Sequence, residues 1–141
     1  MIPTDIEKAY IAGFFDGEGS FGISPNLSQV MIELTSTNED ILTWICTFFK
    51  FGRYSRAKQP RAKQTYRIFI AGSEEARTFI ESIGPYIKIK KEQVEVIRDF
   101  LNTISVRANR HGVSDETMLQ RAILKNRIGK LNQRGNDDDD G

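Results

Sequence analysis

Residues 29–35 alternate strictly between two sets of side chains, and this alternation constrains the fold more than any other feature of the sequence. Successive side chains of a β-strand point to opposite faces of the sheet. One face would carry Val30, Ile32 and Leu34, and the other Gln29, Met31, Glu33 and Thr35. A strand of this kind needs an apolar layer on one side only, which predicts a sheet covered by helices on a single face.

Helical and strand patterns alternate along the rest of the chain. Apolar residues at helical spacing predict five helices, and the capping residues expected for four of them are Thr4 or Asp5, Thr37 or Asn38, Ser73 and Ser114. The remaining helix is expected over residues 90–103. The second helix is expected to carry the apolar residues Ile41, Leu42, Ile45, Phe48 and Phe49, and the last helix an apolar face of Met118, Leu119, Ala122 and Ile123. Strands are expected over residues 20–26 and 29–35, and two more on either side of a loop at residues 59–61. This order predicts an α+β fold with one four-stranded antiparallel sheet backed by helices.

Length and composition favour one folded unit. With 141 residues, 39% of them apolar, the chain fits a single domain with a substantial core. We expect this domain to span residues 1–135, and residues 136–141, which include four consecutive aspartates, to form a disordered acidic tail. The chain shows neither a membrane-spanning stretch nor a targeting signal, so we expect a soluble, intracellular protein without a membrane partner.

A block of positive charge suggests a polyanionic partner. Residues 50–67 contain seven Lys and Arg residues and no acidic residue. Removing the four tail aspartates from the net charge of +1 leaves +5. Because protein surfaces usually mix charge signs, the block favours nucleic acid, and an ordinary basic surface is the alternative interpretation.

The sheet face opposite the helices is the natural place for such a partner. Its predicted residues all carry hydrogen-bonding groups, and cations outnumber anions among them: Ser24, Asn26, Gln29, Glu33, Thr35, Arg56, Lys58 and Arg67. Side chains two apart along a strand can meet successive bases in a major groove. A merely solvated face is equally compatible with this composition.

The end of the first helix combines two glycines with an acidic residue. Gly13 and Gly17 are four residues apart on one helix face, where the missing side chains let another helix approach closely. Glu18 follows, flanked by Gly17 and Gly19. If two copies of this helix pair, two Glu18 carboxylates meet and favour a divalent cation with oxygen ligands, above all Mg²⁺. Such a centre can activate water for attack on a phosphodiester.

The stretch Ile-Ala-Gly-Phe-Phe-Asp-Gly-Glu-Gly at residues 11–19 resembles the signature motif of LAGLIDADG homing endonucleases. The order of elements and the segment at residues 84–93 resemble the same family. The resemblance implies the αββαββα fold, with a saddle-shaped sheet over DNA major grooves and a dimer interface through Gly13 and Gly17. It implies a homodimeric, metal-dependent endonuclease that makes double-strand breaks with short 3′ overhangs in a long, pseudo-palindromic DNA site.

The resemblance also implies roles for individual residues. Glu18 matches the metal-binding catalytic acid, the Gly17 carbonyl a further metal ligand, and Lys90 the active-site lysine. The metal would be Mg²⁺, with Mn²⁺ or Ca²⁺ able to occupy the site. Asp16 is expected to be structural, with a catalytic role as the alternative, and Ser36 stands where relatives often have glutamine. The predicted DNA contacts are the open-face residues named above together with Ser36, Tyr54 and Lys88.

Other interpretations stay open at this stage. A cleavage-inactive relative that serves as an RNA maturase or a DNA-binding module would share the fold, and an unrelated α+β domain could carry the motif by chance. The presence of both Glu18 and Lys90 favours the nuclease. Lys88 or Lys91 would replace Lys90 as the catalytic lysine if the register is shifted. Four cations of the last helix either reach the DNA backbone or form a solvated face: Arg121, Lys125, Arg127 and Lys130.

Overall fold

The computed structural model describes residues 1–55, 63–70, 72–104 and 112–139. Its elements are α1 (Asp5–Glu18), β1 (Gly19–Ile23), β2 (Val30–Ser36), α2 (Glu39–Ile45), β3 (Gly52–Ser55), β4 (Tyr66–Ile70), α3 (Ser73–Ile83), the 3₁₀ turn η1 (Gly84–Tyr86), α4 (Lys91–Asn102) and α5 (Asp115–Asp139). This order confirms the predicted α+β class. The loop predicted at residues 59–61 lies outside the described residues. No helix in the described ranges has the length and apolar character needed to cross a membrane.

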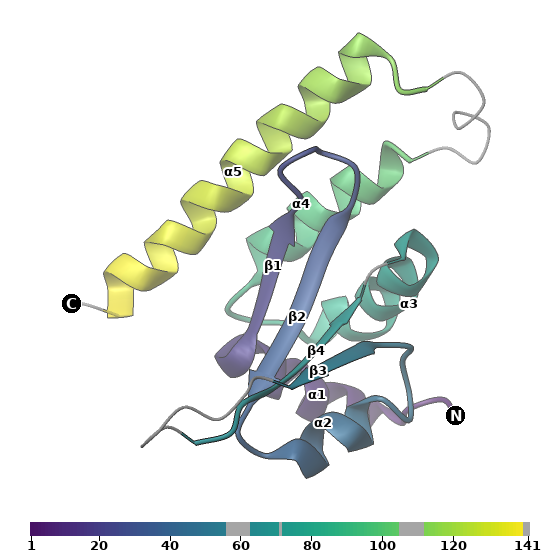
Figure 1. The fold of residues 1–141 in the computed structure, drawn as a ribbon, viewed down its shortest axis with the longest axis vertical. Coiled ribbons are helices and arrows are strands. Elements are labelled where there is room, and N and C mark those ends of the chain that lie inside the picture. Colours follow the sequence, from purple (N-terminus) through teal and green to yellow (C-terminus); the bar gives the residue numbers. More distant parts are fainter. Residues whose placement is uncertain (56–62, 71, 105–111, 140–141) are drawn as a thin grey trace.

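The strands form one antiparallel sheet in the order β1-β2-β4-β3. The alternation predicted for β2 is confirmed, because Val30, Ile32 and Leu34 are buried while Met31 is exposed. Register places Ile68 and Ile70 of β4 beside this apolar row. Helices α1, α3 and α4 cover the apolar face, and the other face is open (Figure 1).

Phe15 ties α1 to β1. Its ring is fully buried, with its centroid 4.5 Å from that of Phe21 and 5.5 Å from that of Phe79. A Cβ atom at Gly19 would lie 2.6 Å from the Phe15 ring, closer than real Cβ contacts allow. Only glycine therefore fits where the chain passes directly from the helix into the strand.

Two elements are shorter than predicted. β1 ends at Ile23 because the Ser24 hydroxyl accepts hydrogen bonds from the N–H groups of Ser28 and Gln29, both at 3.1 Å, and so starts the turn early. α2 ends at Ile45, where the N–H of Phe48 bonds back three residues to the Ile45 carbonyl at 3.0 Å. The helical pattern expected to include Phe48 and Phe49 thus continues as tight turns.

α5 packs along α4 and the outer edge of β1 (Figure 1). The Asn132 side chain donates to the Phe21 carbonyl at 2.9 Å and so covers part of that strand edge. The apolar face predicted around residues 118–123 is wrong, since Leu119 and Ile123 are 63% and 60% exposed. α5 instead turns Ile128 and its neighbours toward the core, and it continues to Asp139, into the acidic segment predicted as a tail.

Candidate active site and nucleic-acid interface

The C-terminal end of α1 presents a group of oxygen atoms at the surface. Glu18 is the last residue of the helix, and both Glu18 and Gly17 are exposed. The final carbonyls of any helix lack intrahelical partners and carry partial negative charge. The Glu18 carboxylate and these carbonyls therefore gather where β1 begins.

Asp16 joins this helix end to the segment that precedes α4. Its carboxylate is only 8% exposed and accepts hydrogen bonds from the backbone N–H groups of Lys88 at 2.9 Å, Ile89 at 3.1 Å and Lys90 at 3.1 Å. Three successive N–H groups directed at one carboxylate form an anion-binding turn. This arrangement favours the structural role expected for Asp16 over the catalytic alternative.

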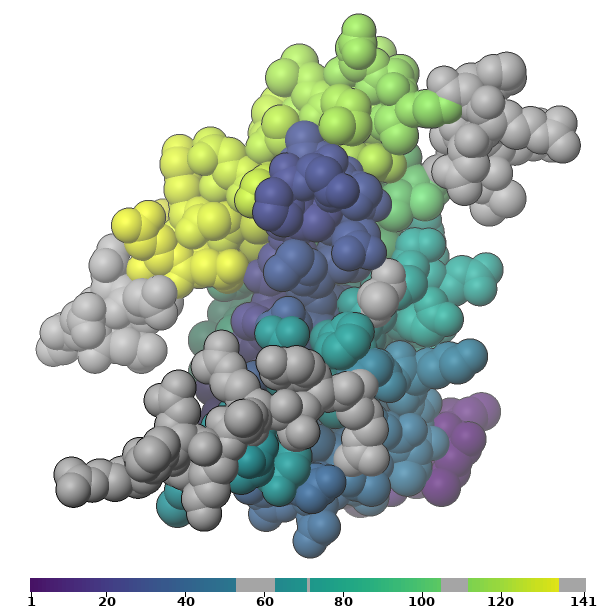
Figure 2. All heavy atoms as spheres, in the orientation of Figure 1, coloured from purple at the N-terminus to yellow at the C-terminus, as the bar shows by residue number. Residues whose placement is uncertain are grey.

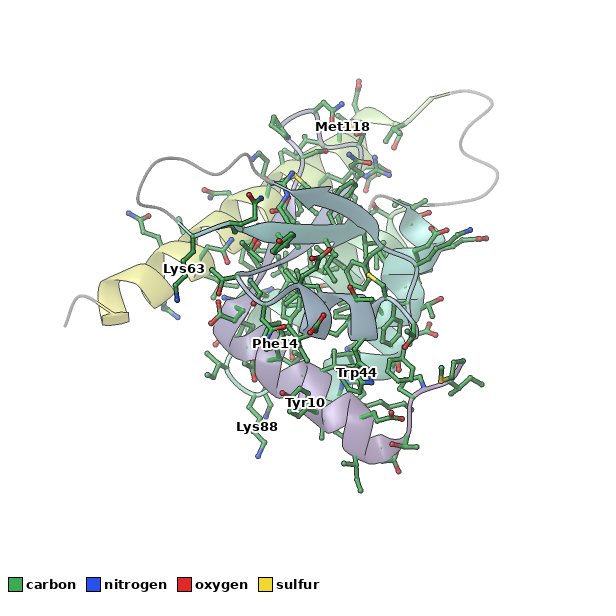
Figure 3. The ribbon with its side chains drawn as sticks, turned by 60° about the horizontal axis from the view of Figure 1, so that its bottom comes forward. Tyr10, Phe14, Trp44, Lys63, Lys88 and Met118 are labelled. Carbon is green, nitrogen blue, oxygen red and sulfur yellow. The ribbon has the colours of Figure 1, made fainter. Side chains whose placement is uncertain are left out.

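Lys90 reaches the same helix end. Its Nζ donates to the backbone carbonyl of Asp16 at 2.6 Å, which places a cation where the helix dipole favours one. Asp16 precedes Glu18 by two residues, so the Lys90 ammonium lies at the helix end that carries Glu18. Lys88 is exposed and projects outward (Figure 3).

The open face of the sheet carries an ion pair. Arg67 Nη1 lies 3.5 Å from Glu33 Oε2, and the Arg67 guanidinium lies 5.9 Å from the centre of the Phe69 ring. Thr35 is the strand neighbour of Arg67 in β2, which puts both side chains on this face, and the backbone of Tyr54 pairs with Arg67 from β3. Both partners of the ion pair are partly exposed, and such pairs contribute about 0–1 kcal/mol. Breaking the ion pair between Arg67 and Glu33, so that either side chain can contact DNA, therefore costs little free energy.

Several predicted contact residues are placed differently. Ser24 is 6% exposed, and its hydroxyl donates to Asn26 Oδ1 at 2.7 Å inside the β1–β2 loop, so it does not stand on the open face. Ser36 is the last residue of β2 and lies on the face opposite Thr35. Its hydroxyl accepts a hydrogen bond from the N–H of Asn38 at 3.0 Å and so stabilises the turn before α2. The predicted contacts Arg56 and Lys58 lie outside the described residues.

The glycines of α1 are not required by the fold of the single chain. A Cβ atom at Gly13 or Gly17 would meet nothing within 4 Å, although each glycine inside a helix costs about 1 kcal/mol relative to alanine. Ile6 and Tyr10 lie on the same helix face and are 83% and 58% exposed. Tyr10 packs edge-on against Trp44 with ring centroids 5.7 Å apart (Figure 3). α1 therefore presents a continuous apolar and small-residue stripe to the exterior.

Arg121 is the residue whose role the sequence analysis missed. It is 5% exposed and its guanidinium lies 5.0 Å from the centre of the Phe100 ring. Burial lowers the pKa of Arg121 from its ordinary value. Both roles considered for it, a contact with the DNA backbone and a solvated face, are wrong. Its helical spacing with Leu124 and Ile128 was the signal that could have placed it inside.

No group of three or more His, Cys, Asp or Glu side chains comes together among the residues that the structure describes. Within the described part of one chain, the acidic side chains therefore do not build a metal cluster. The Glu18 carboxylate and the last-turn carbonyls of α1 supply oxygen ligands only, the type that Mg²⁺ and Ca²⁺ prefer.

Comparisons with known proteins give one family and one fold. The sequence model described as LAGLIDADG-like domain matches residues 5–84. The archaeal intron-encoded homing endonuclease I-Vdi141I, solved in complex with DNA, superposes with a TM-score of 0.72 at 21% identity, covering 90% of this chain and 84% of that one. The homing endonuclease I-CvuI, in complex with the I-CreI target in the presence of Mg, gives a TM-score of 0.68 at 19% identity, covering 89% and 82%. The homing endonuclease I-TnaI superposes with a TM-score of 0.63 at 17% identity, covering 95% of this chain and 99% of that one. No curated protein matches the sequence significantly.

Proposed function

Because the chain belongs to the LAGLIDADG-like domain family, we propose that it is a homodimeric, divalent-metal-dependent endonuclease that cuts both strands of a long, specific DNA site. The observation that carries this proposal is the hydrogen bond from Lys90 to the exposed helix end that carries Glu18. This helix leads directly into β1, a strand of the sheet whose uncovered face is polar. The proposed cutting group therefore lies next in sequence to the proposed reading surface.

The donor set at the end of α1 fits a hard divalent cation. It offers the Glu18 carboxylate and the carbonyl of Gly17, and in a dimer the partner's Glu18 joins them. Mg²⁺ bound there supplies Lewis-acid activation of a water molecule toward the phosphodiester. Mn²⁺ and Ca²⁺ have oxygen-ligand chemistry close enough to occupy the same position.

The chain's own residues prepare this site. Asp16 fixes the segment at residues 88–90 against α1, and this clamp sets the position of the Lys90 ammonium. Lys90 then offsets negative charge that develops on the phosphate oxygens during cleavage. The exposed Glu18 carboxylate would hold the metal, and the bound metal would supply the activated water.

The dimer forms through α1. Gly13 and Gly17 leave space on the exposed stripe for the partner's helix, and Ile6 and Tyr10 extend the contact toward the N-terminus. A two-fold axis between the helices brings the two Glu18 carboxylates together. It also places two sheets side by side, and their open faces together form a saddle over the DNA. A protein of this symmetry prefers a pseudo-palindromic site.

The test is selection of cut sites from a randomised duplex library incubated with the protein and Mg²⁺, followed by sequencing of the cut ends. We expect a set of related sites with approximate two-fold symmetry and short 3′ overhangs. A parallel reaction with a chelator serves as the control. Cut ends that are no more frequent with Mg²⁺ than with the chelator would contradict the proposed activity.

A further inference from the structure

The loop of the β1–β2 hairpin has a conformation that its own sequence does not favour. Leu27 has φ of 60°, in the left-handed region where a residue with a side chain pays about 1–2 kcal/mol. Ser24 stabilises the loop, because its hydroxyl accepts hydrogen bonds from the N–H groups of Ser28 and Gln29. The backbone N–H of Ser24 donates to the Gln29 carbonyl at 2.9 Å and closes the loop.

Arg121, which follows Leu27 by 94 positions in the chain, holds the tip of this loop. Arg121 Nη1 donates to the carbonyl of Leu27 at 3.2 Å, while its Nε donates to Thr103 Oγ1 at 2.9 Å. Phe100 lies under the guanidinium, and the whole side chain is buried. Arg121 therefore connects the hairpin tip to the end of α4 and to α5. In Figure 2 the tip of the hairpin rests against the N-terminal part of α5.

The position of this tip relative to Glu18 gives the connection a functional meaning. Glu18 directly precedes β1, and the loop at residues 24–29 follows its far end. Five strand residues span roughly 17 Å at about 3.3 Å per residue. Base pairs are spaced by about 3.4 Å, so the tip meets DNA about five base pairs outward from the point where Glu18 acts.

We propose that Arg121 is a positioning residue for sequence recognition: through the Leu27 carbonyl it sets the hairpin tip that reads the outer base pairs of each half-site. This inference rests on the proposed function, because it needs DNA on the open face. Asn26 and Gln29 are exposed at the tip. Asn26 Oδ1 accepts hydrogen bonds from the Ser24 and Ser28 hydroxyls inside the loop, so Asn26 would read a base through its amide nitrogen. By fixing the loop backbone, Arg121 would position both side chains. Arg121 itself is buried and touches no base. α5, whose cations the sequence left open as DNA-backbone contacts or a solvated face, thereby contributes to specificity.

The test compares three variants with the wild type. Arg121→Met keeps the apolar stem and removes every donor. Thr103→Val removes the hydroxyl that receives Arg121 Nε and disturbs the same connection more mildly, which keeps the test decisive if Arg121→Met folds poorly. Arg127→Met is the matched control, because it removes an equal charge from an exposed position on the same helix, where even a contact with the DNA backbone would carry no base preference.

Each variant is titrated against the selected DNA site and against all its single-base changes, at two salt concentrations. For Arg121→Met we expect the preference at the outer positions read by the hairpin tip to fall by about tenfold, within the usual effect of one mismatched base pair. The preference at central positions and the salt dependence should stay as in the wild type. Thr103→Val should show a smaller loss at the same positions, and Arg127→Met should leave the base preferences unchanged.

A second measurement uses the protein without DNA. Amide hydrogen exchange at Leu27, Ser28 and Gln29 should accelerate in Arg121→Met and Thr103→Val and not in Arg127→Met, because only the first two release the loop. Equal loss of preference at all base positions, or an unchanged profile in Arg121→Met, would overturn the inference while leaving the proposed function standing. If the wild type itself selects no DNA sequence, the inference fails together with the proposed function.

Discussion

Replacing Asp16 by asparagine tests whether this carboxylate is a clamp between α1 and the start of α4. Asparagine keeps one acceptor oxygen, which can still serve the N–H groups of Ile89 and Lys90, but its amide nitrogen faces the N–H of Lys88. Losing one charge-assisted hydrogen bond costs about 1.5–3 kcal/mol, and the two that remain become neutral and weaker. We expect Asp16→Asn to lower the free energy of unfolding by about 3 kcal/mol and the Tm by roughly 10 °C.

Urea unfolding followed by tryptophan fluorescence measures this loss. Trp44 is the single tryptophan, and it packs against Tyr10 and Phe48, so its emission reports the folded state. Asp5→Asn is the matched control, because Asp5 lies on the same helix and accepts only an exposed hydrogen bond from the Tyr86 hydroxyl at 3.0 Å. Its effect should stay below about 1 kcal/mol. If Asp16→Asn is as stable as the wild type and yet does not cut DNA, the carboxylate acts in catalysis and the clamp argument is refuted.

Three further predictions concern the dimer, the reading face and the catalytic lysine. Gly13→Leu or Gly17→Leu should abolish dimerisation in sedimentation while leaving the fold intact, since a Cβ atom at either position meets no described atom within 4 Å. An unchanged dimer would place the interface elsewhere. Arg67→Ala should lower the binding free energy on the selected DNA site by about 1–3 kcal/mol and relax the base preference at one position per half-site. Lys88→Ala should weaken binding to all sequences alike and reduce the slope of affinity against salt by about one unit. Equal losses for Arg67→Ala on cognate and scrambled duplexes would show that Arg67 makes only an electrostatic contact. Lys90→Met should slow cleavage by about 100-fold or more with binding retained, and a cutting rate close to the wild type would assign the role to another lysine.

The strands and the first helix were predictable because their signals are local. The alternation from Val30 to Leu34 specified which face is buried, and Thr4 forms the capping box with Glu7 that begins α1. The position of Glu18 at the end of α1 was predictable because the motif ends that helix. The expectation that Lys90 lies at the same helix end came from the family resemblance and not from spacing, because these residues are far apart in the chain. The catalytic roles of both residues stay predictions.

What the sequence did not reveal depends on contacts between distant segments. Ser24 has the residue type of a base-reading group, but the turn uses its hydroxyl for Ser28 and Gln29. Arg121 has the residue type of a surface cation, but Leu27 and Thr103 supply acceptors that make its burial favourable. In both residues the polar group serves the protein itself, and only the three-dimensional partners reveal this.

The central claim is that Glu18 is the metal-binding acid of a DNA-cutting site. The most direct test compares wild type and Glu18→Gln on the selected duplex, with cleavage measured in Mg²⁺ and binding measured in Ca²⁺. The amide preserves the shape, loses affinity for the metal and removes a negative charge near the phosphates. We expect cleavage by Glu18→Gln to disappear while specific binding is equal to or tighter than that of the wild type. Cleavage by Glu18→Gln within about tenfold of the wild type, a loss of only about 1.4 kcal/mol in the barrier, would contradict the claim.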